Sequence, residues 1–459
     1  MSRVLILGHE RLSEQMSGTS IRNWEVARAL AGTNDVTVAA PGQVTRSHPQ
    51  FTVTSYTRDS LPALVDAHDV AMCSGFVLHE NPCLLDAEHL VIDLYGPFQL
   101  ESLHQFEDRT QEDRLAMGRS FREVVAQLVR CGDLFLCASE RQRDFWLGWL
   151  DVVGRINVVT HEVDPGYSDL LRVVPFGLPD EPPSPSTPLF RGVVPGIDRD
   201  SYVVLWGGGI WNWFDPLTLI RAAALTRDSL PQLRVVFPAA GSPSEKVPAM
   251  AMSATARALS DELGLTGNRV FFGKGWVPYE RRGSLFLEAD VGVSLHREDI
   301  ETRFSFRTRV LDYLWTGLPI ITTEGDAMAD LVGRHDLGAE VRYGDVEGVA
   351  TALIALSDPA RRRECQERTV AVADEFRWSK VASPLIDFCA RPHQAPDRAL
   401  ARSRQPAPRA IDPTLRGPAE LARLARRTAE TIRRTGWDGV AAKVREYVRR
   451  RTAGLPGIR

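Results

Sequence analysis

Arginine side chains cluster in the stretch of sequence that precedes Asp312. Arg303, Arg307 and Arg309 stand there on either side of Ser305, which is a residue type that often caps the start of a helix. Planar guanidinium groups match phosphate oxygens, whereas cations in the first turn of a helix oppose its dipole. The pattern therefore predicts that this loop binds phosphate. The alternative is a surface ion pair between Arg309 and Asp312.

A run of three glycines, residues 207–209, makes a second candidate phosphate loop. It follows an apolar run, and Asp215 and Pro216 then give a typical helix start. A strand, a glycine loop and a helix N-terminus together offer free N–H groups to an anion. The alternative is a tight turn whose aromatic residues pack as core. The run is not the GxGxxG motif of dinucleotide binding, so it gives no support to a redox function.

Both loops follow short apolar runs, which are typical of buried parallel strands. A third loop, with Gly325 and Asp326, follows another such run and leads into a helix near Ala327. Because the strands of a parallel sheet end at one edge, we expect the three loops to lie together. The runs of this series are 202–206, 233–237, 270–272, 291–295, 319–322 and 340–341.

The first part of the chain repeats the pattern, with apolar runs at 4–7, 36–39, 70–72, 90–92, 134–136 and 172–174. Strands that alternate with helices predict an α/β fold with two doubly wound, Rossmann-like domains facing a cleft. We expect an N-terminal domain over 1–178, a proline-rich linker over 179–200, a second domain over 201–375, a crossing helix over 376–390 and a basic tail over 391–459.

Composition limits the classes of function. The chain has 459 residues and a net charge of −4, so it does not resemble a dedicated nucleic-acid-binding protein. Six scattered cysteines suggest neither a disulfide framework nor a zinc site. No apolar run is long enough for a signal peptide or a membrane span. We expect a cytoplasmic protein.

The tail differs from the rest of the chain because it has 17 basic and 6 acidic residues from Arg391 onward. Two helical patterns there place apolar stripes beside basic residues, as in helices that lie on anionic membranes. The sequence thus predicts peripheral contact with the inner face of the cell membrane. Docking onto the acidic body of the protein and dimer contacts are the alternatives.

Several motifs resemble the retaining GT-B glycosyltransferases of the family 4 type. They are Gly18 with Arg22, the run 173–177, the glycine turn at 207–209, Asp312 five residues before 317–319, the turn at 325–326, and the run from 376 to 385. The resemblance covers about residues 1–390. It implies that the second domain binds a nucleotide-diphosphate sugar and that the first domain holds the acceptor.

The resemblance also implies roles for single residues. Asp312 stands at the second glutamate of the family's E-x7-E motif, which contacts the ribose, whereas Phe304 stands at the first. Glu301 is the substitute for that first glutamate. Gly209 and Phe214 occupy the places of the family's Arg and Lys, so cations from elsewhere must neutralise the diphosphate.

Together the motifs and the resemblance assign the following residues. The catalytic residues are Glu301 and Arg309, and the donor-binding residues are Gly208, Gly209, Lys274, Arg303, Ser305, Phe306, Arg307, Asp312, Gly325 and Asp326. The acceptor-binding residues are Gly18, Arg22, Asp93 and Glu101, although Glu101 could instead be a carboxylate that only stabilises the start of its helix.

We therefore expect a glycosyltransferase of bacterial glycan or glycoconjugate biosynthesis, with a saccharide, lipid-linked or small-molecule acceptor. Neither a metal nor a cofactor is expected, because in the family's proposed retaining route the leaving phosphate takes the acceptor's proton. The alternatives are another GT-B activity, such as an epimerase or a phosphorylase, and a sugar-nucleotide-binding scaffold without transferase activity.

Overall fold

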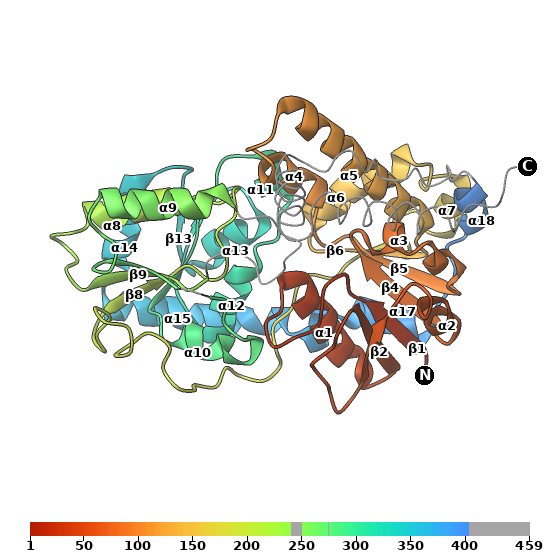
Figure 1. Cartoon of the computed structure of the whole chain (residues 1–459), viewed down its shortest axis with the longest axis horizontal. Coiled ribbons are helices and arrows are strands. Elements are labelled where there is room, and N and C mark those ends of the chain that lie inside the picture. Colours follow the sequence, from red (N-terminus) through yellow and green to blue (C-terminus); the bar gives the residue numbers. More distant parts are fainter. Residues whose placement is uncertain (240–249, 274, 404–459) are drawn as a thin grey trace, which may run out of the picture. The chain divides into compact units, whose positions relative to one another are not determined.

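The computed structural model of the chain describes residues 1–239, 250–273 and 275–403 (Figure 1). Residues 1–108 and 121–403 belong to one compact unit, and this unit contains two parallel sheets. The predicted α/β fold with two doubly wound domains is confirmed. In the described part of the chain, no helix is long and apolar enough to cross a membrane.

The first sheet has the strand order β3-β2-β1-β4-β5-β6-β7, and all its pairs are parallel. Its strands are β1 (Arg3–Leu7), β2 (Asp35–Pro41), β3 (Thr52–Tyr56), β4 (Val70–Ser74), β5 (His89–Asp93), β6 (Leu134–Cys137) and β7 (Leu171–Val173). Its helices are α1 (Gly18–Ala31), α2 (Leu61–Asp66), α3 (Val77–Glu80), α4 (Phe98–Gln105), α5 (Gln111–Cys131), α6 (Glu140–Val152) and α7 (Val158–Val163).

The second sheet has the order β10-β9-β8-β11-β12-β13 and is also parallel. Its strands are β8 (Tyr202–Leu205), β9 (Leu233–Phe237), β10 (Val270–Phe272), β11 (Val291–Ser294), β12 (Ile320–Thr323) and β13 (Gly338–Val341). Its helices are α8 (Pro216–Leu225), α9 (Ala251–Glu262), α10 (Arg282–Leu287), α11 (Ile300–Phe304), α12 (Thr308–Thr316), α13 (Ala327–His335), α14 (Val346–Ala355) and α15 (Pro359–Ala373).

Alternation of side chains along β8 explains the layers of the second domain. Val203 and Leu205 point to one core, with residues of α10 and α12, whereas Val204 and Trp206 point to the other, with residues of α8, α9 and α14. Helices therefore cover both faces of this sheet (Figure 1). A strand buried on both faces must be apolar throughout, as its sequence is.

The chain crosses between the sheets twice, and the two crossings are hydrogen-bonded to each other. Residues 179–200 contain no helix or strand. Leu178 N donates to Phe376 O over 2.7 Å, and Trp378 N donates to Leu178 O over 2.9 Å. The chain then continues through α16 (Trp378–Val381), α17 (Ser383–Ala390) and α18 (Arg398–Ser403). Ser2 Oγ donates to Cys389 O over 2.6 Å, so α17 packs at the first strand of the chain.

One expected helix start is wrong. Ser305 does not cap the helix that holds Asp312. It ends the short helix α11, and its hydroxyl donates back to Glu301 O over 2.7 Å. The next helix, α12, begins at Thr308 and ends at Gly317, which has φ of +70°. The short helix α11 thus stands where the sequence predicted a loop.

Candidate active site

The glycine loop after β8 is a tight turn with open space beside it. Gly208 has φ of +93°, a conformation that favours glycine, and a Cβ there would have no other heavy atom within 4 Å. Gly207 N donates to the Tyr313 hydroxyl over 2.8 Å. The nearby N-terminus of α8 is already capped, because Asp215 accepts from Thr218 N over 3.0 Å. An anion at this loop would therefore need a cation from another segment.

Arg309 of α12 supplies a cation to that loop. Its Nη2 donates to Gly209 O over 3.1 Å, and its guanidinium lies 4.0 Å from the centre of the Phe214 ring and 4.7 Å from that of Trp206. The residue is only 7% exposed. Among the described residues its Nη1 has no hydrogen-bond partner, and no carboxylate forms an ion pair with the guanidinium. Burial lowers the pKa of Arg309 to about 10, as expected for a cation without a counter-charge.

Arg307 is also buried, but its charge is offset. Its Nη1 and Nη2 donate to the two oxygens of Glu301 over 3.0 and 2.7 Å. Its Nε lies 3.5 Å from Asp326 Oδ2. Burial disfavours the charged form, yet these carboxylates raise the pKa of Arg307. Of Arg307 and Arg309, only Arg309 is therefore left to pair with an anion from outside the protein.

The ion pair with Arg307 occupies the carboxylate of Glu301. Both of its oxygens accept from Arg307, and the Ser305 hydroxyl, which is also close to the Glu301 carbonyl, lies within hydrogen-bond distance of one of them. The carboxylate is 1% exposed. In this arrangement Glu301 orders the loop through its own partners, and its predicted contact with a donor stays a prediction.

Asp326 joins this cluster from the third loop. Its Oδ1 caps α13, accepting from Met328 N over 2.7 Å, and its Oδ2 lies 3.1 Å from Nε2 of His296. Despite burial, the neighbouring His296 and Arg307 lower the pKa of Asp326. Burial, with Arg307 beside it, lowers the pKa of His296, whereas Asp326 opposes this shift. His296 stands two residues after the end of β11, and no motif of the sequence pointed to it.

Position 325 requires glycine because of its backbone conformation and the nearby Tyr343 side chain. Gly325 has φ of +107°, and a Cβ on it would meet the Tyr343 hydroxyl at 1.9 Å. Its carbonyl accepts from Nη1 of Arg141, a residue of α6, over 2.7 Å. Helix α6 of the first domain thus donates a hydrogen bond to the third loop.

Asp312 lies on α12 but does not pair with Arg309, so the alternative of an Arg309–Asp312 surface pair is wrong. Its Oδ1 lies 3.2 Å from Nε of Arg282, the first residue of α10. Burial raises the pKa of Asp312, and Arg282 opposes this shift. Arg282 was not identified from the sequence, because it stands 30 residues away from its partner.

Two of the predicted acceptor residues contact each other. Arg22 and Asp93 form a buried ion pair, with Nε 2.5 Å from Oδ2, and Arg22 also donates to the carbonyls of Val174 and Pro175. The pair ties α1 to the ends of β5 and β7. Gly18 begins α1 and has open space at its Cα.

Glu101 lies on α4, a helix that packs against α11, which carries Glu301. Burial raises the pKa of Glu101 to about 7, the charge on Glu301 adds to this shift, and Arg307 opposes it. A carboxyl group with such a pKa is poised to hold or release a proton near neutral pH. The helix of Glu101 therefore packs against the helix of Glu301, whereas Arg22 and Asp93 form a pair of their own.

The remaining predicted donor residues differ in their surroundings. Arg303 is exposed, and its guanidinium lies 5.9 Å from the ring of Phe304. The Phe306 carbonyl accepts from the Tyr95 hydroxyl over 3.4 Å. Lys274 lies outside the described residues.

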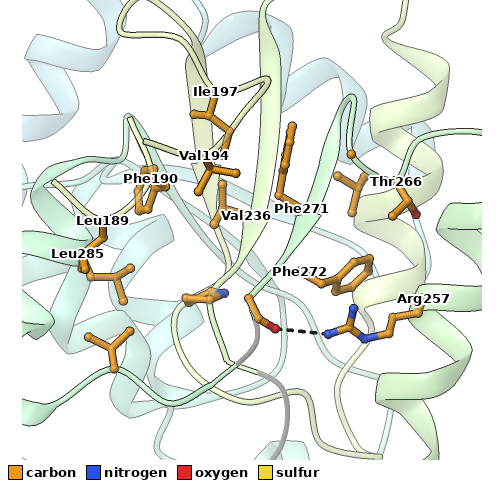
Figure 2. A pocket seen from close by; sticks show the side chains of 15 residues that line it. Leu189, Phe190, Val194, Ile197, Val236, Arg257, Thr266, Phe271, Phe272 and Leu285 are labelled. Carbon is orange, nitrogen blue, oxygen red and sulfur yellow. Dashed lines mark hydrogen bonds between the residues drawn. The ribbon is translucent and has the colours of Figure 1, made fainter. Parts of the chain in front are cut away.

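A cavity of about 330 Å³ lies beside the edge strand β10 (Figure 2). Its walls are mostly apolar and come from the linker, from β9 and β10, and from α10. Arg257 lies at its rim, where it donates to the Gly273 carbonyl over 3.3 Å and stacks 4.5 Å from the centre of the Phe272 ring. Within the described ranges, no cluster of three or more His, Cys, Asp or Glu side chains could hold a metal ion.

Solved structures with two such domains are similar to this one. Sucrose-phosphate synthase from Thermosynechococcus elongatus aligns with a TM-score of 0.60 at 16% identity, over 85% of this chain and 99% of that one. HepE from Anabaena, in complex with UDP and glucose, aligns with a TM-score of 0.59 at 13% identity, over 85% and 100%. The chain has the GT-B fold.

A third neighbour is WaaG, a glycosyltransferase involved in lipopolysaccharide biosynthesis. Its TM-score is 0.58 at 15% identity, over 84% of this chain and 100% of that one. No family model and no curated protein matches the chain by sequence. At these identities the GT-B assignment rests on the arrangement of the elements, and the chemistry must be argued from the site.

Proposed function

We propose that the protein is a glycosyltransferase that moves a sugar from a nucleoside diphosphate sugar to a saccharide, lipid-linked or small-molecule acceptor. The observation that carries the proposal is Arg309, a buried guanidinium without a counter-charge beside the glycine loop at 207–209. A buried charge is costly unless it is paired, and a bound diphosphate would complete the pair.

The second domain also has room for the base and the ribose of a nucleoside diphosphate. The ends of β8 and β10 are two strand spacings apart, about 10 Å, a separation that a nucleoside diphosphate can span. We infer that the diphosphate binds beside Arg309 and that the base lies toward the cavity at Arg257 and Phe272. Asp312, whose side chain is 26% exposed, then accepts from the ribose hydroxyls.

The chemistry follows from where charge develops. As the bond between the anomeric carbon and the phosphate oxygen breaks, negative charge grows on the leaving diphosphate, and Arg309 stabilises it. The acceptor oxygen forms the new bond to the anomeric carbon on the face that the diphosphate leaves, and the leaving phosphate takes the proton of that hydroxyl. The configuration is therefore retained. Glu101, on the acceptor side, holds that hydroxyl in place by a hydrogen bond.

A thermal-shift panel tests donor binding, with UDP, GDP and dTDP added without metal. A ligand at 100 times its dissociation constant stabilises the native state by about 2.7 kcal/mol, which raises the melting temperature by several degrees. A shift with one nucleotide selects the sugars to test for transfer. No shift with any of the three would reject the proposal.

A second candidate is a nucleotide-sugar-binding scaffold. The engagement of both Glu301 oxygens by Arg307 favours it, because no free carboxylate then stands at that position. Donor binding without hydrolysis or transfer to any offered acceptor would support the scaffold and contradict the enzyme.

We also propose a cytoplasmic protein whose basic tail lies on an anionic membrane. The support is the sequence of residues 391–459 alone, since those from 404 onward lie outside the described residues. Co-sedimentation of the full chain with phosphatidylglycerol vesicles, but not with phosphatidylcholine vesicles, is the expected result.

A further inference from the structure

The guanidinium of Arg282 is held between two aromatic rings. It lies 4.1 Å from the centre of the Tyr279 ring and 4.8 Å from that of Trp315. Its Nε lies 3.2 Å from Asp312 Oδ1. A cation fixed in this way loses little further freedom when it orients a carboxylate. One oxygen of Asp312 is thus aligned by Arg282, while the side chain remains partly open to solvent.

The side chains of Tyr279 and Trp315 each form a hydrogen bond to another part of the chain. The Tyr279 hydroxyl donates to Glu25, a buried residue of α1. The Trp315 Nε1 donates to the carbonyl of Glu181 in the linker over 2.9 Å. Arg28 connects these anchors, because it lies 3.0 Å from Glu25 and 3.0 Å from Glu181.

We propose that Arg282 is a positioning residue for the nucleotide ribose, and that Tyr279 makes this positioning depend on the contact with α1. The inference rests on the proposed function. Arg282 fixes Asp312 in the orientation that accepts the ribose hydroxyls. The stack on Tyr279 is in place when Glu25 meets the Tyr279 hydroxyl. The ribose contact is therefore complete only when the first domain lies against the second, as it does here.

An Asp312 carboxylate held in place by Arg282 predicts that the protein prefers nucleotides with both ribose hydroxyls over deoxynucleotides. A carboxylate already aligned for a hydroxyl binds it without a further cost in side-chain freedom, and removing the hydroxyl leaves the carboxylate with a lost partner. The wild-type chain should bind UDP or GDP about tenfold more tightly than the matching 2′-deoxy or 3′-deoxy nucleotide. The variant Arg282→Met should lose most of this preference, because Asp312 is no longer oriented.

Isothermal titration of the full chain with these nucleotides measures the preference directly. Arg363→Met is the matched control, since Arg363 is an exposed arginine on α15, and it should keep the wild-type preference. A wild-type chain that binds no nucleotide would reject the proposed function. A wild-type chain that binds nucleotides without a preference, or an Arg282→Met variant that keeps the full preference, would reject the inference alone.

Two more variants keep the test decisive. Arg282→Lys retains the charge and replaces Arg282→Met in the test if that variant does not fold. It should show an intermediate preference for the ribose hydroxyls, because an ammonium group lacks the planar fork of a guanidinium. Tyr279→Phe keeps the stacked ring and removes the hydroxyl that reaches Glu25. It should lower the preference without abolishing it, and an unchanged preference would contradict the role of the contact with α1.

Discussion

At the scale of single residues, the two neighbouring arginines of the second loop differ in their counter-charges. Arg307 faces Glu301 and Asp326, whereas Arg309 faces two aromatic rings and a backbone carbonyl. A buried charge without a partner reduces stability, and a buried pair that loses one partner loses more. The difference gives opposite predictions for the same substitution at two positions.

Arg309→Met should raise the free energy of unfolding of the ligand-free protein, because it removes an uncompensated buried charge and keeps the apolar contacts. Arg307→Met should lower it by about 3–5 kcal/mol, since Glu301 is then left buried without its partner. Urea unfolding of both variants, followed by circular dichroism, measures the two changes. Equal losses at both positions would contradict the assignment of Arg309 as the unpaired cation.

Glu101 predicts a pH dependence of stability. Its pKa is about 7 in the folded chain, above the ordinary value of 4.5. Between these two values the folded state binds more protons than the unfolded state, so the contribution of Glu101 to stability falls as the pH rises. Glu101→Gln should remove this slope, whereas Glu112→Gln, at an exposed position, should keep it. Melting temperatures from pH 4.5 to pH 8 test the difference.

At the scale of elements, the backbone geometry at Gly325 constrains the third loop. Gly325 combines φ of +107° with a Tyr343 hydroxyl where a Cβ would stand. Gly325→Ala should therefore lower the free energy of unfolding by about 1–3 kcal/mol and weaken nucleotide binding. Gly264→Ala is the control, because Gly264 also has a positive φ of +66° but has open space around it. A loss no larger than that of the control would contradict the steric argument.

The strands were predictable and the site was predictable in part. Runs such as 202–206 are apolar throughout because both faces of the strand are buried, so β8 is visible in the sequence. Strand β3 was missed because Thr52 to Tyr56 is a polar edge strand. Helix α11 was missed because its packing against α4 and α6, on the other sheet, stabilises it. Partners such as Arg282 and His296 meet the predicted residues only through the fold.

At the scale of the whole molecule, residues of the first domain bond to the donor loops of the second. The fully buried Gln142 of α6 donates to Tyr95 O over 2.9 Å and to Phe304 O over 2.8 Å. Arg141 donates to Gly325 O and lies 2.5 Å from Asp330. The geometry of the donor loops therefore depends on the arrangement of both domains.

Arg141→Met tests this dependence. Arg141 and Asp330 are more than one-third exposed, so the loss of their pair should change the free energy of unfolding by less than about 1 kcal/mol. The Gly325 carbonyl, however, loses its donor from the first domain. We expect a lower kcat/KM for transfer with a nearly unchanged melting temperature. An unchanged kcat/KM would show that the donor loops do not need this contact.

The central claim is that Arg309 holds the diphosphate of a nucleotide donor. The most direct measurement is isothermal titration of the wild-type chain and of Arg309→Met with UDP, GDP and dTDP. We predict that one nucleotide binds the wild type and that the variant binds it more weakly by over ~1 kcal/mol, while remaining at least as stable to urea. Equal dissociation constants for the two chains would contradict the claim.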